Sequence, residues 1–83
     1  MKSTLVFIDL NTKIINDFNF TIILLINKNV RKRHIISMTK SFINYWKHII
    51  FMYKTVSIIS EQQYMYLIKR LKYYDDYVND LYF

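Results

Sequence analysis

"TKSFINYWKHIIFMYKTVSII", residues 39–59, shows the clearest periodicity in this 83-residue chain. Its apolar side chains recur every three or four positions, which is the spacing of one face of an α-helix. These side chains are Phe42, Tyr45, Trp46, Ile49, Met52, Tyr53 and Val56. The pattern predicts an amphipathic helix over about residues 39–59. Ile43 and Ile50 fall outside that face, so we expect them to be exposed on the monomer and to contact a protein partner.

The segment after this helix carries the start signal of a second one. Ser60 followed by Gln63 fits a capping box, and Glu61 in the first turn suits the positive end of the helix dipole. An apolar face then continues along the segment, made of Tyr64, Leu67, Ile68, Leu71, Tyr74, Val78 and Leu81. We therefore predict a second amphipathic helix over residues 61–82.

The N-terminal third has the composition of β-strands. "STLVFIDL" (residues 3–10) and "FNFTIILLIN" (residues 18–27) are rich in β-branched and aromatic residues, and the "NTK" that follows the first run fits a turn. These signals predict a short β-hairpin or extended segment, although "TIILLI" (residues 21–26) fits a buried helix equally well. The expected fold is α+β and mainly helical, in a single small domain over residues 1–83.

The composition limits what can hold this fold together. The chain has no Cys, which excludes disulfides and thiolate metal sites, and a domain of this size buries only about 60% of its unfolded surface. We therefore expect it to be an obligate part of a large assembly. No transmembrane span is expected, because the longest uncharged run, residues 18–27, has ten residues, whereas a spanning helix needs about 20 apolar residues.

The same composition indicates the kind of genome that encodes the chain. Ala, Cys, Gly and Pro are absent, while Ile, Lys, Tyr, Asn, Phe and Met, which have AT-rich codons, dominate. An AT-rich genome of this kind belongs to an organelle, a reduced endosymbiont or a virus. We expect a mitochondrial, organelle-encoded protein, with a plastid as the alternative.

Positive charge is concentrated in the middle of the chain. Residues 28–54 contain seven basic side chains and no acidic one: Lys28, Arg31, Lys32, Arg33, Lys40, Lys47 and Lys54. Residues 1–27 form a neutral segment, and residues 55–83, which contain the C-terminal helix, carry one more acidic than basic side chain. Segregation of this kind is the electrostatic footprint of a polyanion-binding protein. We predict that the seven basic side chains bind RNA phosphates.

Three of these side chains, Lys40, Lys47 and Lys54, are seven residues apart and so line one side of the predicted helix. That side lies about 160° from Ile49, nearly opposite the predicted apolar face. A helix with a core face and a basic stripe behind it suits packing against an RNA backbone. Lysines that only keep a surface helix solvated give the same pattern.

Side chains for catalysis or metal binding are sparse. The two imidazoles, His34 and His48, have no carboxylate pair at metal-ligand spacing. A Gly-rich phosphate loop is impossible without Gly. We expect no enzyme activity, no metal and no cofactor.

Short motifs follow one another between residues 27 and 60: Asn27-Lys28-Asn29-Val30, Arg33 with Ile35, Met38-Thr39, and Val56-Ser57-Ile58-Ile59. In this order they resemble the bacterial and plastid type of the eighteenth small-subunit ribosomal protein. A Gln-Arg pair and an Ala-Arg pair of that family are missing here, and Ser60 stands in place of a Pro. The resemblance implies RNA contacts at Lys28, Arg33, Lys47 and Lys54, and docking on a neighbouring small-subunit protein.

These observations lead to three functional hypotheses. The first is a structural RNA-binding subunit of an AT-rich organelle ribosome, with ribosomal RNA and neighbouring ribosomal proteins as partners. The alternative is a non-catalytic accessory subunit of an organelle-encoded respiratory membrane complex. Its basic turn would face anionic lipid headgroups, where each basic residue contributes about 1 kcal/mol. A small viral DNA-binding or host-interaction protein also fits the composition. All three need one basic and one apolar face, so periodicity does not choose among them.

Overall fold

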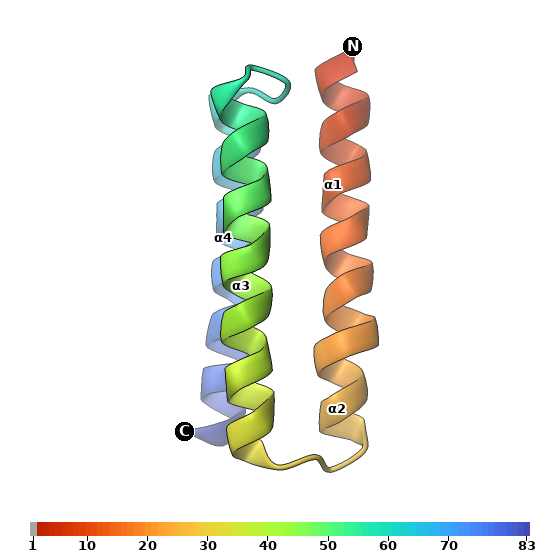
Figure 1. Cartoon of the computed structure of the whole chain (residues 1–83), viewed down its shortest axis with the longest axis vertical. Coiled ribbons are helices and arrows are strands. Elements are labelled where there is room, and N and C mark those ends of the chain that lie inside the picture. Colours follow the sequence, from red (N-terminus) through yellow and green to blue (C-terminus); the bar gives the residue numbers. More distant parts are fainter. Residues whose placement is uncertain (1) are drawn as a thin grey trace.

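The computed structural model describes residues 2–83 as a bundle of three antiparallel helical segments, 41 × 18 × 16 Å in extent (Figure 1). The first segment combines α1 (Lys2–Phe18), a π-helical turn η1 (Asn19–Ile23) and α2 (Leu24–Asn27). One loop leads to α3 (Lys32–Thr55), and a second loop leads back to α4 (Glu61–Tyr82). The N-terminus and the α3–α4 loop share one end of the bundle, and the C-terminus and the α2–α3 loop share the other.

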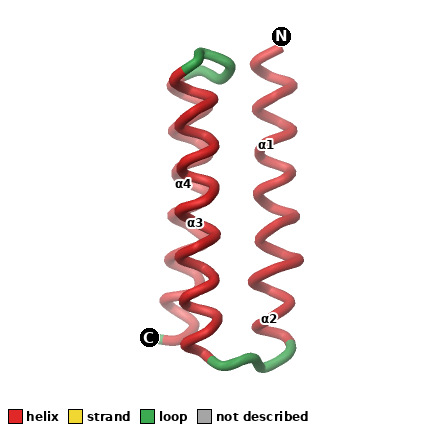
Figure 2. The backbone as a smooth tube through the Cα atoms, in the orientation of Figure 1, coloured by secondary structure: helices red, strands yellow, loops and turns green. Residues whose placement is uncertain are grey.

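The N-terminal third is helical, so the predicted β-hairpin, and with it the α+β class, is wrong (Figure 2). No strand occurs within residues 2–83, and the expectation of a mainly helical chain is confirmed. The buried side chains of the first segment, Leu10, Ile14, Phe18 and Ile22, are four residues apart, which is a helical spacing. Burial against the other two helices therefore outweighs the β propensity of the many Ile and Phe residues.

The π-helical turn keeps this buried row in line. Side chains four residues apart advance by about 40° around an α-helix at each step, so a row that starts at Leu10 would leave the core before Ile22. In η1 the Leu24 N–H donates to the Asn19 carbonyl oxygen, five residues back, which adds about one residue to the turn. The added residue is spread over the five residues of η1 and rotates Ile22 back toward the row, and Ile22 is completely buried.

The loops turn without glycine. Asn29 after α2 and Ser57 after α3 both have left-handed backbone angles, with φ of 56° and 61°. A side chain at such a position adds strain that Gly would avoid, and Asn tolerates it better than most residues. The helix predicted over 39–59 exists, but it begins earlier, at Lys32, and ends earlier, at Thr55.

The start of α4 agrees with its sequence signal. The Gln63 N–H donates to Ser60 Oγ (3.1 Å), and the Ser60 N–H donates to Gln63 Oε1 (2.9 Å). The predicted capping box is therefore confirmed, and α4 spans Glu61–Tyr82, which agrees with the predicted helix.

The buried face of α3 differs from the predicted one. Its buried side chains are Ile35, Thr39, Phe42, Ile43, Trp46 and Ile50. The prediction that Ile43 and Ile50 are exposed is wrong, because they are 7% and 0% exposed and so do not present a surface to a partner. Tyr45, Met52 and Val56, which were expected in the core, are more than half exposed. The face is rotated because α3 packs against both α1 and α4.

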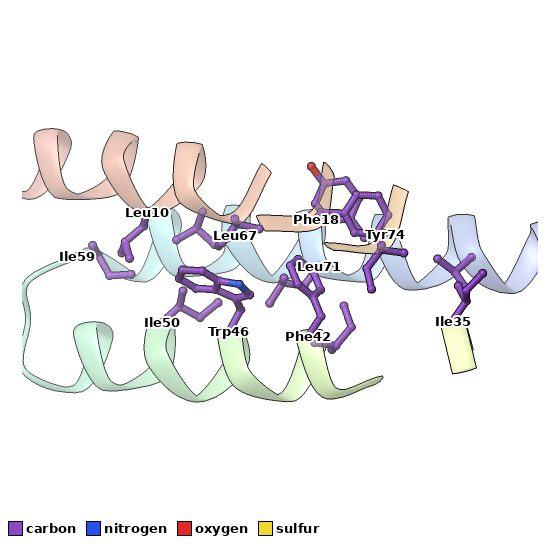
Figure 3. Packing of buried hydrophobic residues seen from close by; sticks show 14 residues of the cluster. Leu10, Phe18, Ile35, Phe42, Trp46, Ile50, Ile59, Leu67, Leu71 and Tyr74 are labelled. Atoms are coloured by element: carbon purple, nitrogen blue, oxygen red, sulfur yellow. The ribbon is translucent and has the colours of Figure 1, made fainter. Parts of the chain in front are cut away.

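Buried side chains from all three segments form one cluster along the bundle (Figure 3). The Phe18 and Tyr74 rings are stacked, with centroids 3.9 Å apart and planes 6° apart. Phe42 contacts both, with centroids 5.6 Å from Phe18 and 6.1 Å from Tyr74. One aromatic ring from each helical segment therefore joins the three segments, in geometries that add to area burial.

A polar contact also joins α1 to α3. The Trp46 Nε1–H donates to Asp17 Oδ2 (2.7 Å), and the Thr21 hydroxyl donates to Asp17 Oδ1 (3.1 Å). Trp46 is 7% exposed, so Asp17 supplies the acceptor that its buried indole N–H needs. A hydrogen bond to an ionised carboxylate is stronger than a neutral one. The contact fixes the register of α1 on α3, because the single indole N–H donates to one residue of α1.

We predict that Asp17→Leu destabilises the bundle more than Asp17→Asn, because asparagine keeps an oxygen that can accept the indole N–H. A buried donor left without an acceptor costs about 1–3 kcal/mol. Urea denaturation followed by circular dichroism gives the free energy of unfolding. Trp46→Phe is the control, since it removes the donor. In this background the difference between the two Asp17 variants should shrink to the part that comes from the Thr21 hydroxyl, and an undiminished difference would contradict the assignment.

Candidate nucleic-acid interface

Four of the predicted RNA-binding residues lie together at one end of the bundle. Lys28 and Arg31 belong to the α2–α3 loop, and Lys32 and Arg33 begin α3. All four are exposed, and none takes part in an ion pair within residues 2–83. We call Lys28, Arg31, Lys32 and Arg33 the basic end.

The start of α3 adds positive potential to the basic end. The intrahelical ladder begins with the Ile35 N–H, which donates to the Arg31 carbonyl oxygen (3.1 Å), so the preceding N–H groups have no partner inside the helix. The first turn has no acidic residue, and Arg31 at the N-cap makes no side-chain capping bond. Cations at this terminus face the positive end of the helix dipole. The arrangement does not stabilise α3, but it suits an anion.

A shallow hollow borders the basic end on one side. It is lined by Val30, Arg31, Arg33, His34 and Ser37. Two guanidinium groups, a hydroxyl and an imidazole can all donate hydrogen bonds to phosphate oxygens. The hollow therefore offers donors from both the loop and the first turns of α3.

The lysine stripe does not form one surface with the basic end. Lys40 and Lys47 are exposed, and they border a hollow that also contains Asp75 and Asn79 of α4. The prediction that the stripe lies opposite the buried face is wrong. The buried face of α3 includes Ile43 and Ile50, which lie next to the lysines around the helix. The stripe instead follows the border between α3 and α4.

Lys54 is committed to contacts within the chain. Its Nζ lies 3.1 Å from Glu61 Oε2 and 5.0 Å from the centroid of the Tyr64 ring. Lys13 and Lys72 form similar pairs, with Asp9 (3.0 Å) and Asp76 (3.4 Å). The hydrogen bond to Asp9 raises the pKa of Lys13. We call Lys13, Lys54 and Lys72 the paired lysines.

Sequence reasoning assigned no role to several aromatic residues that the structure exposes. Tyr74 is the one tyrosine that is buried. Tyr66 and Tyr73 are 48% and 64% exposed. Both lie outside the apolar face predicted for α4, and this position was the signal in the sequence that the two rings are exposed. Phe83 is 83% exposed, and the Lys32 Nζ lies 4.6 Å from the centroid of its ring.

No group of three His, Asp or Glu side chains comes together within residues 2–83 in a way that could hold a metal ion. No helix of this part of the chain has the length and apolar character needed to cross a membrane.

Comparison of the chain with protein-family models, curated proteins and solved structures found no match. The resemblance of residues 27–60 to a ribosomal protein family therefore stays a prediction.

We predict that His34→Glu stabilises the bundle relative to His48→Glu. His34 is the third residue of α3, whereas His48 is exposed in the middle of the same helix. A carboxylate in the first turn complements the dipole and the neighbouring cations, which contributes about 0.3–1 kcal/mol at low ionic strength.

Urea denaturation of both variants at low and high salt tests this difference. The gain should shrink at high salt, because exposed charges are screened. Equal stabilities of the two variants at low salt would contradict a concentrated positive potential at the start of α3.

Proposed function

We propose that the protein is a non-catalytic RNA-binding subunit that holds phosphates with its basic end. The observation that carries this proposal is the gathering of Lys28, Arg31, Lys32 and Arg33 around the unpaired N–H groups of α3, with no carboxylate paired to them within residues 2–83. Phosphate contacts of this kind position a protein on RNA without reading its sequence.

The number of contacts determines the affinity that the basic end can supply. Each phosphate contact with single-stranded nucleic acid contributes a slope of about −0.7 to the dependence of log K on log salt concentration, so four contacts give about −3. Binding of this strength is weak at physiological salt. The basic end therefore suits a subunit that other components of a particle also hold in place.

The particle that we propose is the ribosome of an AT-rich organelle, mitochondrial or plastid. The resemblance of residues 27–60 and the codon bias support this assignment. Of the four RNA contacts that the resemblance implies, Lys28 and Arg33 lie in the basic end. Lys47 lies beside Asp75, and Lys54 is paired with Glu61. Lys28 and Arg33 are therefore the contacts that we retain.

A second candidate function rests on apolar side chains around the basic end. Leu24 is 44% exposed one turn before Lys28, and Phe83 is 83% exposed beside Lys32. Exposed apolar groups among cations are typical of a protein surface that lies on anionic lipid. This arrangement favours an accessory subunit of a respiratory membrane complex as the alternative.

We predict that changing Arg31, Lys32 and Arg33 together to Gln weakens RNA binding and lowers the salt slope by about 2, because three phosphate contacts are lost. The matched control changes the paired lysines, Lys13, Lys54 and Lys72, to Gln. It removes the same charge and should leave the slope close to that of the wild type.

Fluorescence anisotropy of a labelled RNA across a salt series measures both affinities and slopes, and circular dichroism checks that the variants fold. Equal slopes for the two triple variants would mean that net charge, and not the basic end, binds RNA. Vesicles of phosphatidylcholine with phosphatidylserine provide the second arm. Binding to these vesicles without binding to RNA would support the membrane alternative.

A further inference from the structure

Four side chains of α4 line a shallow hollow far from the basic end in sequence: Tyr66, Lys69, Arg70 and Tyr73. Their spacing of three, four and seven residues places them on one side of the helix. The buried side chains of α4, Leu67, Leu71, Tyr74 and Val78, occupy another side. We call Tyr66, Lys69, Arg70 and Tyr73 the tyrosine face.

Contacts with neighbouring side chains hold the Tyr66 ring in place. It meets the Phe7 ring of α1 edge-on, with centroids 5.3 Å apart and planes 75° apart. The Arg70 Nη2–H donates to the Tyr66 hydroxyl (3.1 Å), and Arg70 Cζ lies 5.6 Å from the ring centroid. Burial works against the charge of Arg70, but the neighbouring hydroxyls of Tyr66 and Tyr74 outweigh it and raise the pKa of the guanidinium. Tyr66 is nevertheless 48% exposed.

The Tyr73 ring rests on the core. Its centroid lies 5.9 Å from that of Tyr74, with planes 61° apart, and Tyr74 is itself stacked on Phe18. Tyr73 is 64% exposed, so most of its ring is available to a ligand. A ring whose motion is restricted by such a contact loses less conformational entropy when a ligand stacks on it.

Two ordered, exposed aromatic rings with cations between them match the needs of a single-stranded nucleic acid. Bases stack on aromatic side chains, and phosphates contact Lys and Arg. Lys69 is exposed and has no ion pair within residues 2–83. Tyr66 and Tyr73 are separated by about 10 Å along the helix, which leaves room for Lys69 and Arg70 to reach the backbone between two stacked bases.

We propose that the tyrosine face binds single-stranded RNA, with bases stacked on Tyr66 and Tyr73 and phosphates held by Lys69 and Arg70. This inference rests on the proposed function in taking RNA as the ligand, but it uses none of the residues of the basic end. It adds the class of RNA that the protein prefers, which phosphate contacts alone do not determine.

The neighbouring charges favour a narrow ligand. Asp76 and Asp80 follow Tyr73 on the next turns of α4, and Asp76 is paired with Lys72 (3.4 Å). A flat anionic membrane laid on the tyrosine face would meet these carboxylates, whereas a single strand can pass clear of them. The bases of a duplex are stacked on one another, so their faces are closed to Tyr66 and Tyr73.

The test compares Tyr73→Leu with Tyr73→Phe in the full chain. Phenylalanine keeps the ring, whereas leucine removes it from an exposed position and should not disturb the fold. Stacking of one base is worth about 5- to 140-fold in affinity. Tyr73→Leu should weaken binding of a labelled single-stranded RNA by such a factor, and Tyr73→Phe should bind like the wild type. Tyr45→Leu is the matched control, because Tyr45 is 59% exposed on α3, outside the tyrosine face.

A hairpin duplex of the same length provides the second ligand. Tyr73→Leu should leave duplex binding and the salt slope unchanged, whereas Lys69→Gln should lower the slope by about 0.7 for the single strand. Single-strand binding by Tyr73→Leu equal to that of the wild type, or an equal loss for both ligands, would overturn the proposal. The triple Gln variant of the basic end separates the two proposals, because it leaves the tyrosine face intact. Its loss of binding relative to the wild type tests the basic end, and the preference of its remaining binding for the single strand tests the tyrosine face.

Discussion

The bundle depends on the buried row of its first helical segment, which lies against both α3 and α4. Without this row, α3 and α4 would form a helical hairpin with one side of its apolar surface in water. The row stays straight because η1 adds about one residue to the helical turn that contains Ile22. Most side chains in the row are large, and a close-packed interior does not absorb a rotation of such side chains by even a fraction of a turn. The hydrogen bond from Trp46 to Asp17 then fixes the register at one point.

The position of the basic end follows from this packing. In a three-helix bundle each helix buries the flanks that face two neighbours, so its polar surface is narrow. The lysines along α3 therefore lie at its border with α4, where Glu61 and Asp75 also lie. The end of a helix, in contrast, is not flanked by neighbouring helices on every side. The cations that begin α3 thus remain available, while Lys54 is paired within the chain.

The sequence predicted those parts of the molecule that depend on local signals. The capping box at Ser60 sets the start of α4, and the basic residues of the α2–α3 loop are adjacent in the chain, so both were found. The failures have a common cause, which is tertiary packing. The β-branched and aromatic composition of the first segment fits a strand until the four-residue spacing of its buried side chains is known. Ile43 and Ile50 were misassigned because a single apolar face was assumed, whereas α3 buries a wider surface between two neighbours. The pairing of Lys54 with Glu61 is made across a turn whose path the sequence does not give.

The antiparallel packing of α3 on α4 also determines from which side a phosphate would reach the basic end. The acidic side chains near the end of α4, Asp75, Asp76 and Asp80, oppose the dipole of their own helix, but they lie at the end of the bundle where α3 begins. Their attraction for the cations of α3 acts through water and is screened beyond about 8 Å at physiological salt. Lys47 marks the side of α3 that faces α4. Arg31 and His34 lie about 140–160° around the helix from Lys47. The part of the hollow formed by Arg31 and His34 is therefore the side with the least opposing charge, and on this side a phosphate would meet both the cations and the unpaired N–H groups of α3.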